Sequence, residues 1–175
     1  MSKRDLKKYL NELNKEQLEE QILDLYEKFV AVKVYYNFVF NPKEETLLQD
    51  CKLKISHEYF PLPTNGKRKK PKMRRSVAQK YIKHFIVLGV DPFVIADVML
   101  YNLEIAQTFA SQNTIKQDLF YKSMFNSFEQ AFRYIISNGI ISEFQRRLIA
   151  ICDEALEQNW KNVTDFKTSI ELLDS

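Results

Sequence analysis

The sequence contains little glycine and little proline. Of its 175 residues, 3 are glycine and 5 are proline, whereas glycine alone makes up about 7% of an average protein. Folds rich in β-sheet need many tight turns with positive φ angles, and glycine supplies most of them. This shortage argues against a sheet-rich fold and predicts long helices joined by few turns.

Residues that carry catalytic or metal chemistry are also scarce. The two cysteines, Cys51 and Cys152, lie far apart on apolar helix faces, and we expect both to be buried, reduced thiols. The two histidines, His57 and His84, have no metal-binding spacing. No glycine-rich phosphate loop and no G-x-S-x-G element is present. We therefore assign no catalytic residue, no metal ligand and no cofactor, and favour a non-enzymatic protein.

The sequence has no apolar run of the ~18 residues that a membrane-spanning helix needs. The longest, from Phe85 to Leu103, is interrupted by Gly89, Pro92 and two aspartates. The N-terminus, MSKRDLKKYL, is charged throughout and does not resemble a signal peptide. We expect a soluble, cytoplasmic protein that does not use a membrane as a partner.

Apolar residues recur at helical spacing along most of the chain, which predicts an all-α fold. The expected architecture is an antiparallel helical bundle or a short α-superhelix of about seven to nine helices. Prolines, glycines and capping residues place the expected helices at 2–13, 15–40, 42–60, 76–88, 92–110, 115–138, 143–156 and 164–173.

Two capping boxes are expected near the N-terminus, Ser2 with Asp5 and Asn14 with Gln17. The helix expected at 15–40 has apolar residues in steps of 4, 3, 4, 3 and 4, and we expect this face to pack inward. Its members are Leu18, Ile22, Leu25, Phe29, Val32 and Tyr36.

Positive charge is concentrated in one short segment. Of 26 lysines and arginines, seven lie within nine positions; the other 19 face 23 acidic residues, so the rest of the chain carries −4. Three interpretations are open: a solvated loop that aids solubility, a nucleic-acid-binding loop, or a docking site for an acidic protein. The seven residues are Lys67, Arg68, Lys69, Lys70, Lys72, Arg74 and Arg75.

The wider stretch 61–75, which includes these seven residues, is the one candidate domain boundary, because it also contains prolines and Gly66. We expect a helical block over 1–60, a basic linker loop over 61–75 and a second helical block over 76–175, together forming one globular unit.

Asp97 and Glu104 lie seven residues apart on one face of the most apolar helix. Two buried carboxylates could carry out acid–base chemistry. Alternatively, they face solvent or pair with an arginine such as Arg133 or Arg146.

Three stretches resemble a bacterial family of small helical proteins that has no assigned function. They are LKKYLNELNKEQLEEQILDLYEKF (6–29), YYNFVFNP (35–42) and KMRRSVAQKYIKHFIVLGVDPFVIADVMLY (72–101). The resemblance implies an all-α fold and contributes no site residues. The first two expected helices are also similar to the SAP-type DNA-binding helix pair, although Leu13-Asn14-Lys15 replaces the glycine of its turn.

The sequence thus favours a helical protein that contacts nucleic acid or an acidic protein through residues 67–75. The alternative is a helical scaffold for protein–protein interaction that uses the exposed face of the 15–40 helix. A monomer is favoured.

Overall fold

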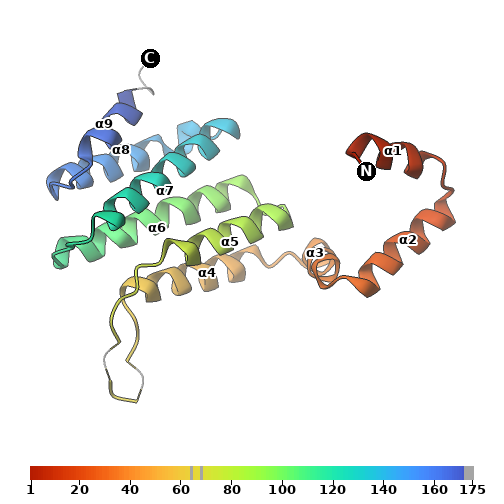
Figure 1. Ribbon diagram of the computed structural model, residues 1–175, viewed down its shortest axis with the longest axis horizontal. Helices are drawn as coiled ribbons and strands as arrows, with labels where there is room; N and C mark the ends of the chain where they lie inside the picture. The colour runs from red at the N-terminus through yellow and green to blue at the C-terminus, as the bar shows by residue number, and fades with distance from the viewer. Residues whose placement is uncertain (64, 68, 172–175) are drawn as a thin grey trace. The chain divides into compact units, whose positions relative to one another are not determined.

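The computed structural model describes residues 1–63, 65–67 and 69–171, and in this part of the chain the regular elements are all α-helices, with no β-strand. The all-α prediction is confirmed, with nine helices in the described residues (Figure 1). The chain divides into two compact units, residues 1–43 and the part that begins at Glu44.

The first unit consists of three helices. They are α1 (Lys3–Asn11), α2 (Lys15–Lys28) and α3 (Val30–Phe40). Both expected capping boxes form: the Asp5 N–H bonds to Ser2 Oγ at 3.2 Å, and the Gln17 N–H bonds to Asn14 Oδ1 at 2.8 Å. In each case the side chain satisfies a backbone donor that the first turn leaves without a partner.

The helix expected over 15–40 is broken at Phe29, which has φ −119° and ψ 115°. Phe29 joins α2 to α3 in an extended conformation, and its side chain makes no hydrogen bond that caps α3. All residues from 1 to 43 are described, and none of them is buried. Within the first unit the 18–36 face is not covered by the other helices: Ile22, Leu25 and Phe29 are 43%, 45% and 54% exposed.

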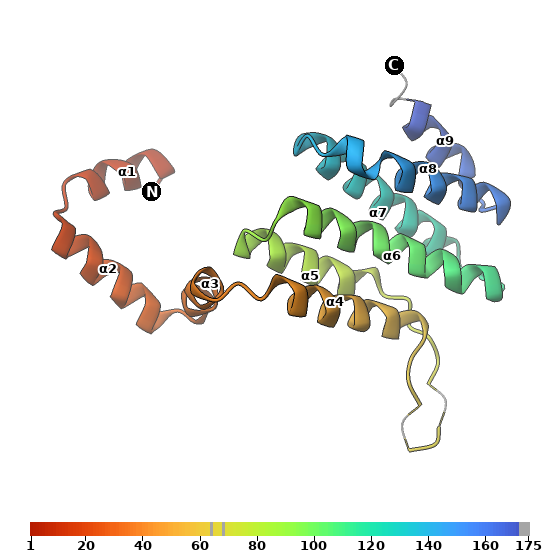
Figure 2. The same ribbon diagram turned by 180° about the vertical axis from the view of Figure 1, so that it is seen from behind.

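The second unit is built around one central helix, α6, which contacts four other helices of this unit, α4, α5, α7 and α8. Figures 1 and 2 show α6 with α5 and α7 beside it. Its residues Ala96, Val98, Leu100, Leu103 and Ala106 are fully buried. The helices of this unit are α4 (Glu44–Tyr59), α5 (Arg75–Leu88), α6 (Pro92–Gln112), α7 (Asp118–Ser137), α8 (Ile141–Glu157) and α9 (Val163–Glu171).

By length and composition α6 could cross a membrane, whereas the sequence had predicted no apolar run long enough to do so. In the structure, 56% of its most apolar window is buried inside the unit. This burial is what the core helix of a globular domain shows.

The starts of several helices differ from the predicted ones. The helices expected at 115–138 and 143–156 start at other positions: α7 begins at Asp118 after Gln117, and α8 begins at Ile141. The helix end expected at 88 and the helix start expected at 92 are confirmed. Gly89 ends α5 with a φ of 71°, and Asp91 caps α6 through the N–H of Phe93 at 2.7 Å.

The division between the units falls after Lys43, whereas the sequence placed a boundary at 61–75. Helix α4 packs on α5 and α6 and buries Cys51, Ile55 and Tyr59 there. Residues 44–60 therefore share one core with the helices that follow the basic segment. The basic segment is a loop within one unit, between two helices that pack on each other.

Candidate nucleic-acid interface

The basic segment is held at its base by Glu58, in the last turn of α4. The N–H groups of Lys72 and Met73 both donate to the Glu58 carbonyl oxygen, at 2.9 and 3.0 Å. This carbonyl belongs to the last helical turn, where carbonyls lack a partner within the helix. The returning arm of the loop is thus fixed to the end of α4, while residues 65–67 lie away from the helices (Figures 1 and 2).

Arg74 strengthens the same attachment through its side chain. Its Nε donates to Glu58 Oε2 at 2.9 Å and its Nη2 donates to Oε1 at 2.7 Å, a two-point ion pair. Glu58 is buried, with 9% of its surface exposed. The hydrogen bonds from Arg74 lower the pKa of Glu58 despite the opposing effect of burial. Glu58 is therefore ionised at neutral pH, and it neutralises Arg74.

Arg75, the first residue of α5, is also held inside the fold. Its Nε donates to Ser127 Oγ at 2.8 Å and its Nη2 donates to Gln130 Oε1 at 2.9 Å, both on α7. Burial lowers the pKa of Arg75. These contacts link α5 to α7, so the main role that the structure supports for Arg75 is joining two helices.

The remaining predicted residues face solvent. Lys67, Lys69, Lys70 and Lys72 are all exposed, and within the described residues none of them forms an ion pair. Arg68 lies outside the described residues. The seven predicted positions thus separate into four exposed lysines and two arginines engaged with other helices. The linear sequence gave no signal for this separation, because the partners Glu58, Ser127 and Gln130 are distant along the chain.

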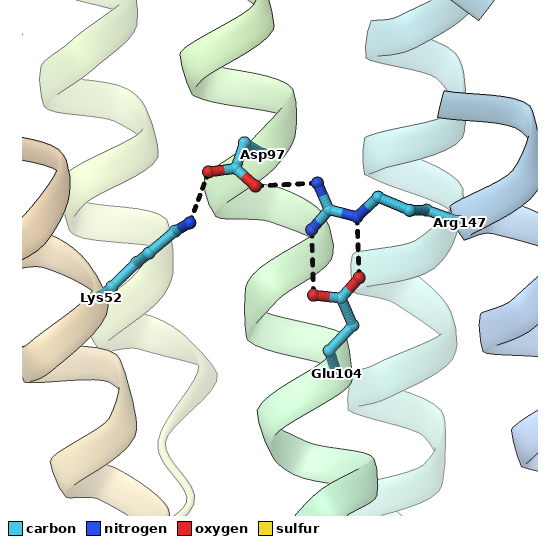
Figure 3. Close-up of polar contacts among 4 residues, drawn as sticks. All are labelled: Lys52, Asp97, Glu104 and Arg147. Atoms are coloured by element: carbon cyan, nitrogen blue, oxygen red, sulfur yellow. Dashed lines mark hydrogen bonds and ion pairs between the residues drawn. The ribbon is translucent and has the colours of Figure 1, made fainter. Parts of the chain in front are cut away.

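Asp97 and Glu104 form an ion-pair network with two basic residues from neighbouring helices (Figure 3). Arg147 of α8 donates to Glu104 at 2.8 and 2.9 Å and to Asp97 at 2.8 Å. Lys52 of α4 contacts the other oxygen of Asp97 at 2.6 Å. The expected partners Arg133 and Arg146 are not the ones used: Arg133 pairs with Glu129 on its own helix.

This network does not favour acid–base chemistry. Burial raises the pKa of Asp97, but the hydrogen bonds from Lys52 and Arg147 outweigh burial and leave that pKa below its usual value. A carboxylate stabilised in its ionised form is a poor proton carrier at neutral pH. The network instead connects α4, α6 and α8.

The cysteines are placed as expected, since both are buried and free. Burial raises the pKa of each thiol to about 12, so both remain protonated and unreactive. Over residues 1–63, 65–67 and 69–171, no three histidine, cysteine, aspartate or glutamate side chains are grouped so that they could hold a metal ion.

The fold and the loop together define an all-α protein with an exposed lysine cluster between two packed helices. The chain belongs to the family of unknown function DUF6155, whose model matches residues 1–174. The predicted membership of a helical family without an assigned function is confirmed. No curated protein and no solved structure matches the chain.

Proposed function

We propose that this protein is a non-enzymatic binding protein that contacts nucleic acid through the lysines of its basic loop. The observation that supports this most is the exposure of Lys67, Lys69, Lys70 and Lys72 on a loop whose base is fixed by Glu58. A cluster of unpaired cations on a protruding segment meets the phosphates of a polyanion without disturbing the helices behind it. An acidic protein is the other polyanion that this cluster fits.

Four lysine contacts make the expected affinity strongly dependent on salt. Each contact releases counterions, so the slope of log K against log salt is about −3.6 for duplex DNA and about −2.8 for single strands. Raising salt from ~50 to ~200 mM then weakens duplex binding ~150-fold. Additional contacts would give a steeper slope, so the measured value reports how many of the three arginines take part.

The test is fluorescence anisotropy with mixed-sequence DNA and RNA at ~50 mM salt, where phosphate contacts are least screened. Replacing the four loop lysines by glutamine should abolish binding. A control variant with the same charge change replaces four exposed lysines elsewhere in the second unit, and it should bind like the wild type. These control positions are Lys54, Lys116, Lys122 and Lys167. If the wild type binds neither nucleic acid, the proposal is wrong.

A protein-interaction role is the second candidate, and the first unit favours it. Its apolar side chains are exposed, and a cavity of about 310 Å³ lies between α2 and α3, lined by Ile22, Leu23, Tyr26, Tyr36 and Phe40. Apolar grooves of this kind accept the apolar face of a partner helix. Replacing Leu23 and Phe40 by glutamate should abolish protein binding and leave nucleic-acid binding unchanged. Identical protein binding by the variant and the wild type would contradict this role.

A further inference from the structure

A cavity of about 510 Å³ lies at the base of the basic loop. One side is formed by the end of α4 and the outgoing arm of the loop, with His57 and Leu62. The other side is formed by the returning arm, with Lys69, Lys70, Lys72 and Arg74. Its volume is within the range of about 300–1,000 Å³ that small-molecule sites occupy. The cavity is larger than a single phosphate group requires.

The charge of this cavity is positive. Three lysines line it, and the one lining carboxylate, Glu58, has both oxygens bonded to Arg74. The lysines are therefore free to meet a phosphate on the returning arm. A phosphate alone would leave the other side of the cavity, with His57 and Leu62, unoccupied.

That other side suits a flat, partly apolar group. The imidazole of His57 is a planar ring, and the Arg74 guanidinium is a second plane held in place by its two-point bond to Glu58. Nucleic-acid bases stack on histidine rings and on arginine guanidinium planes. Leu62 is 64% exposed, so its apolar side chain is open to a ligand beside the lysines. It offers an apolar contact to the same ligand.

We propose that this cavity binds one unpaired nucleotide of a single-stranded nucleic acid, with its phosphate on the lysines and its base against His57, Arg74 and Leu62. This inference rests on the proposed function and refines it. A base inside a duplex cannot enter the cavity unless it is unpaired and unstacked, and both steps cost free energy. The protein therefore prefers single strands, although a duplex carries the higher charge density. The aromatic residue that the basic segment itself lacks is supplied by His57 from α4.

The experiment measures binding of a labelled mixed-sequence RNA of about 12 nucleotides, single-stranded and as the duplex with its complement, at ~50 mM salt. Replacing His57 by alanine, or Leu62 by serine, should weaken single-strand binding at least ~5-fold, the low end of what one stacked base contributes. Duplex binding should stay unchanged. Replacing Lys69 by glutamine should weaken both. Leu62 lies outside the helices, so its replacement should not affect folding, and weaker binding by this variant reports the loss of a contact with the RNA.

Two control variants match these changes outside the cavity. Replacing His84 by alanine and Leu119 by serine, both at exposed positions, should alter neither affinity. Equal weakening of single-strand and duplex binding by the His57 and Leu62 variants, or no weakening by either, overturns the nucleotide site and leaves the proposed function intact. Absence of binding to both RNAs in the wild type overturns both proposals.

Discussion

The network around Arg147 gives the sharpest test of the fold. Replacing Arg147 by glutamine removes three charge-assisted hydrogen bonds, two to Glu104 and one to Asp97. Asp97 keeps its contact with Lys52, whereas Glu104 loses its partner. The replacement therefore removes the ion-pair link between α8 and α6 and leaves the one between α4 and α6 in place.

The burial of the four side chains sets the magnitude. Breaking a fully buried ion pair costs about 3–5 kcal/mol, and an exposed pair contributes about 0–1 kcal/mol. The Arg147 and Asp97 side chains are 33% and 24% exposed, which places the network between these limits. We expect the free energy of unfolding to fall by about 2–3 kcal/mol. For a domain of this size each kcal/mol corresponds to about 4 °C, so the thermal midpoint should fall by about 8–12 °C.

Thermal and urea unfolding followed by circular dichroism measure this loss. The matched control is Arg146→Gln, which has the same charge change at the neighbouring, exposed position and should shift the midpoint little. The loss should also depend on pH. The pKa of Asp97 is lower in the folded protein, so the network stabilises fully above the unfolded value of about 3.9 and its contribution disappears as pH falls through the folded value. Equal midpoints for the two variants at pH 7 would refute this account of the network.

Three further outcomes are expected. Replacing the fully buried Leu103 by alanine should lower the free energy of unfolding by about 2–5 kcal/mol in urea titrations, whereas the same change at the exposed Leu25 should lower it by less than about 1 kcal/mol. Limited trypsin should cut the basic loop after Lys67 or Lys69 before it cuts any helix, because these residues are exposed and the arm is bonded to α4 only from Lys72 onward. A first cut inside α7 or α8, found by mass spectrometry, would contradict this expectation. The two cysteines should react with a thiol reagent at pH 8 only after unfolding, because burial raises both pKa values to about 12.

The helical fold follows from local features of the sequence. Capping residues such as Ser2 and Asn14 act within one turn of the chain, and Gly89 ends a helix because glycine adopts a positive φ without strain. The apolar pattern of residues 92–110 likewise identifies the central helix, because a helix that is apolar on most sides must be covered by others. These effects depend on neighbours a few positions away, so they can be predicted without tertiary contacts.

The roles of the charged residues depend on tertiary structure. The seven basic residues look alike in sequence, yet Glu58 holds Arg74 and α7 holds Arg75, while four lysines remain exposed. The same holds for Asp97 and Glu104, whose partner is Arg147 and not its neighbour Arg146. A change of one position rotates a side chain by about 100° around a helix, so the choice between two adjacent arginines depends on how the helices pack. The sequence therefore singled out the basic segment as a candidate, and only the packing of α4, α5 and α7 decided which of its residues are attached to helices and which are exposed.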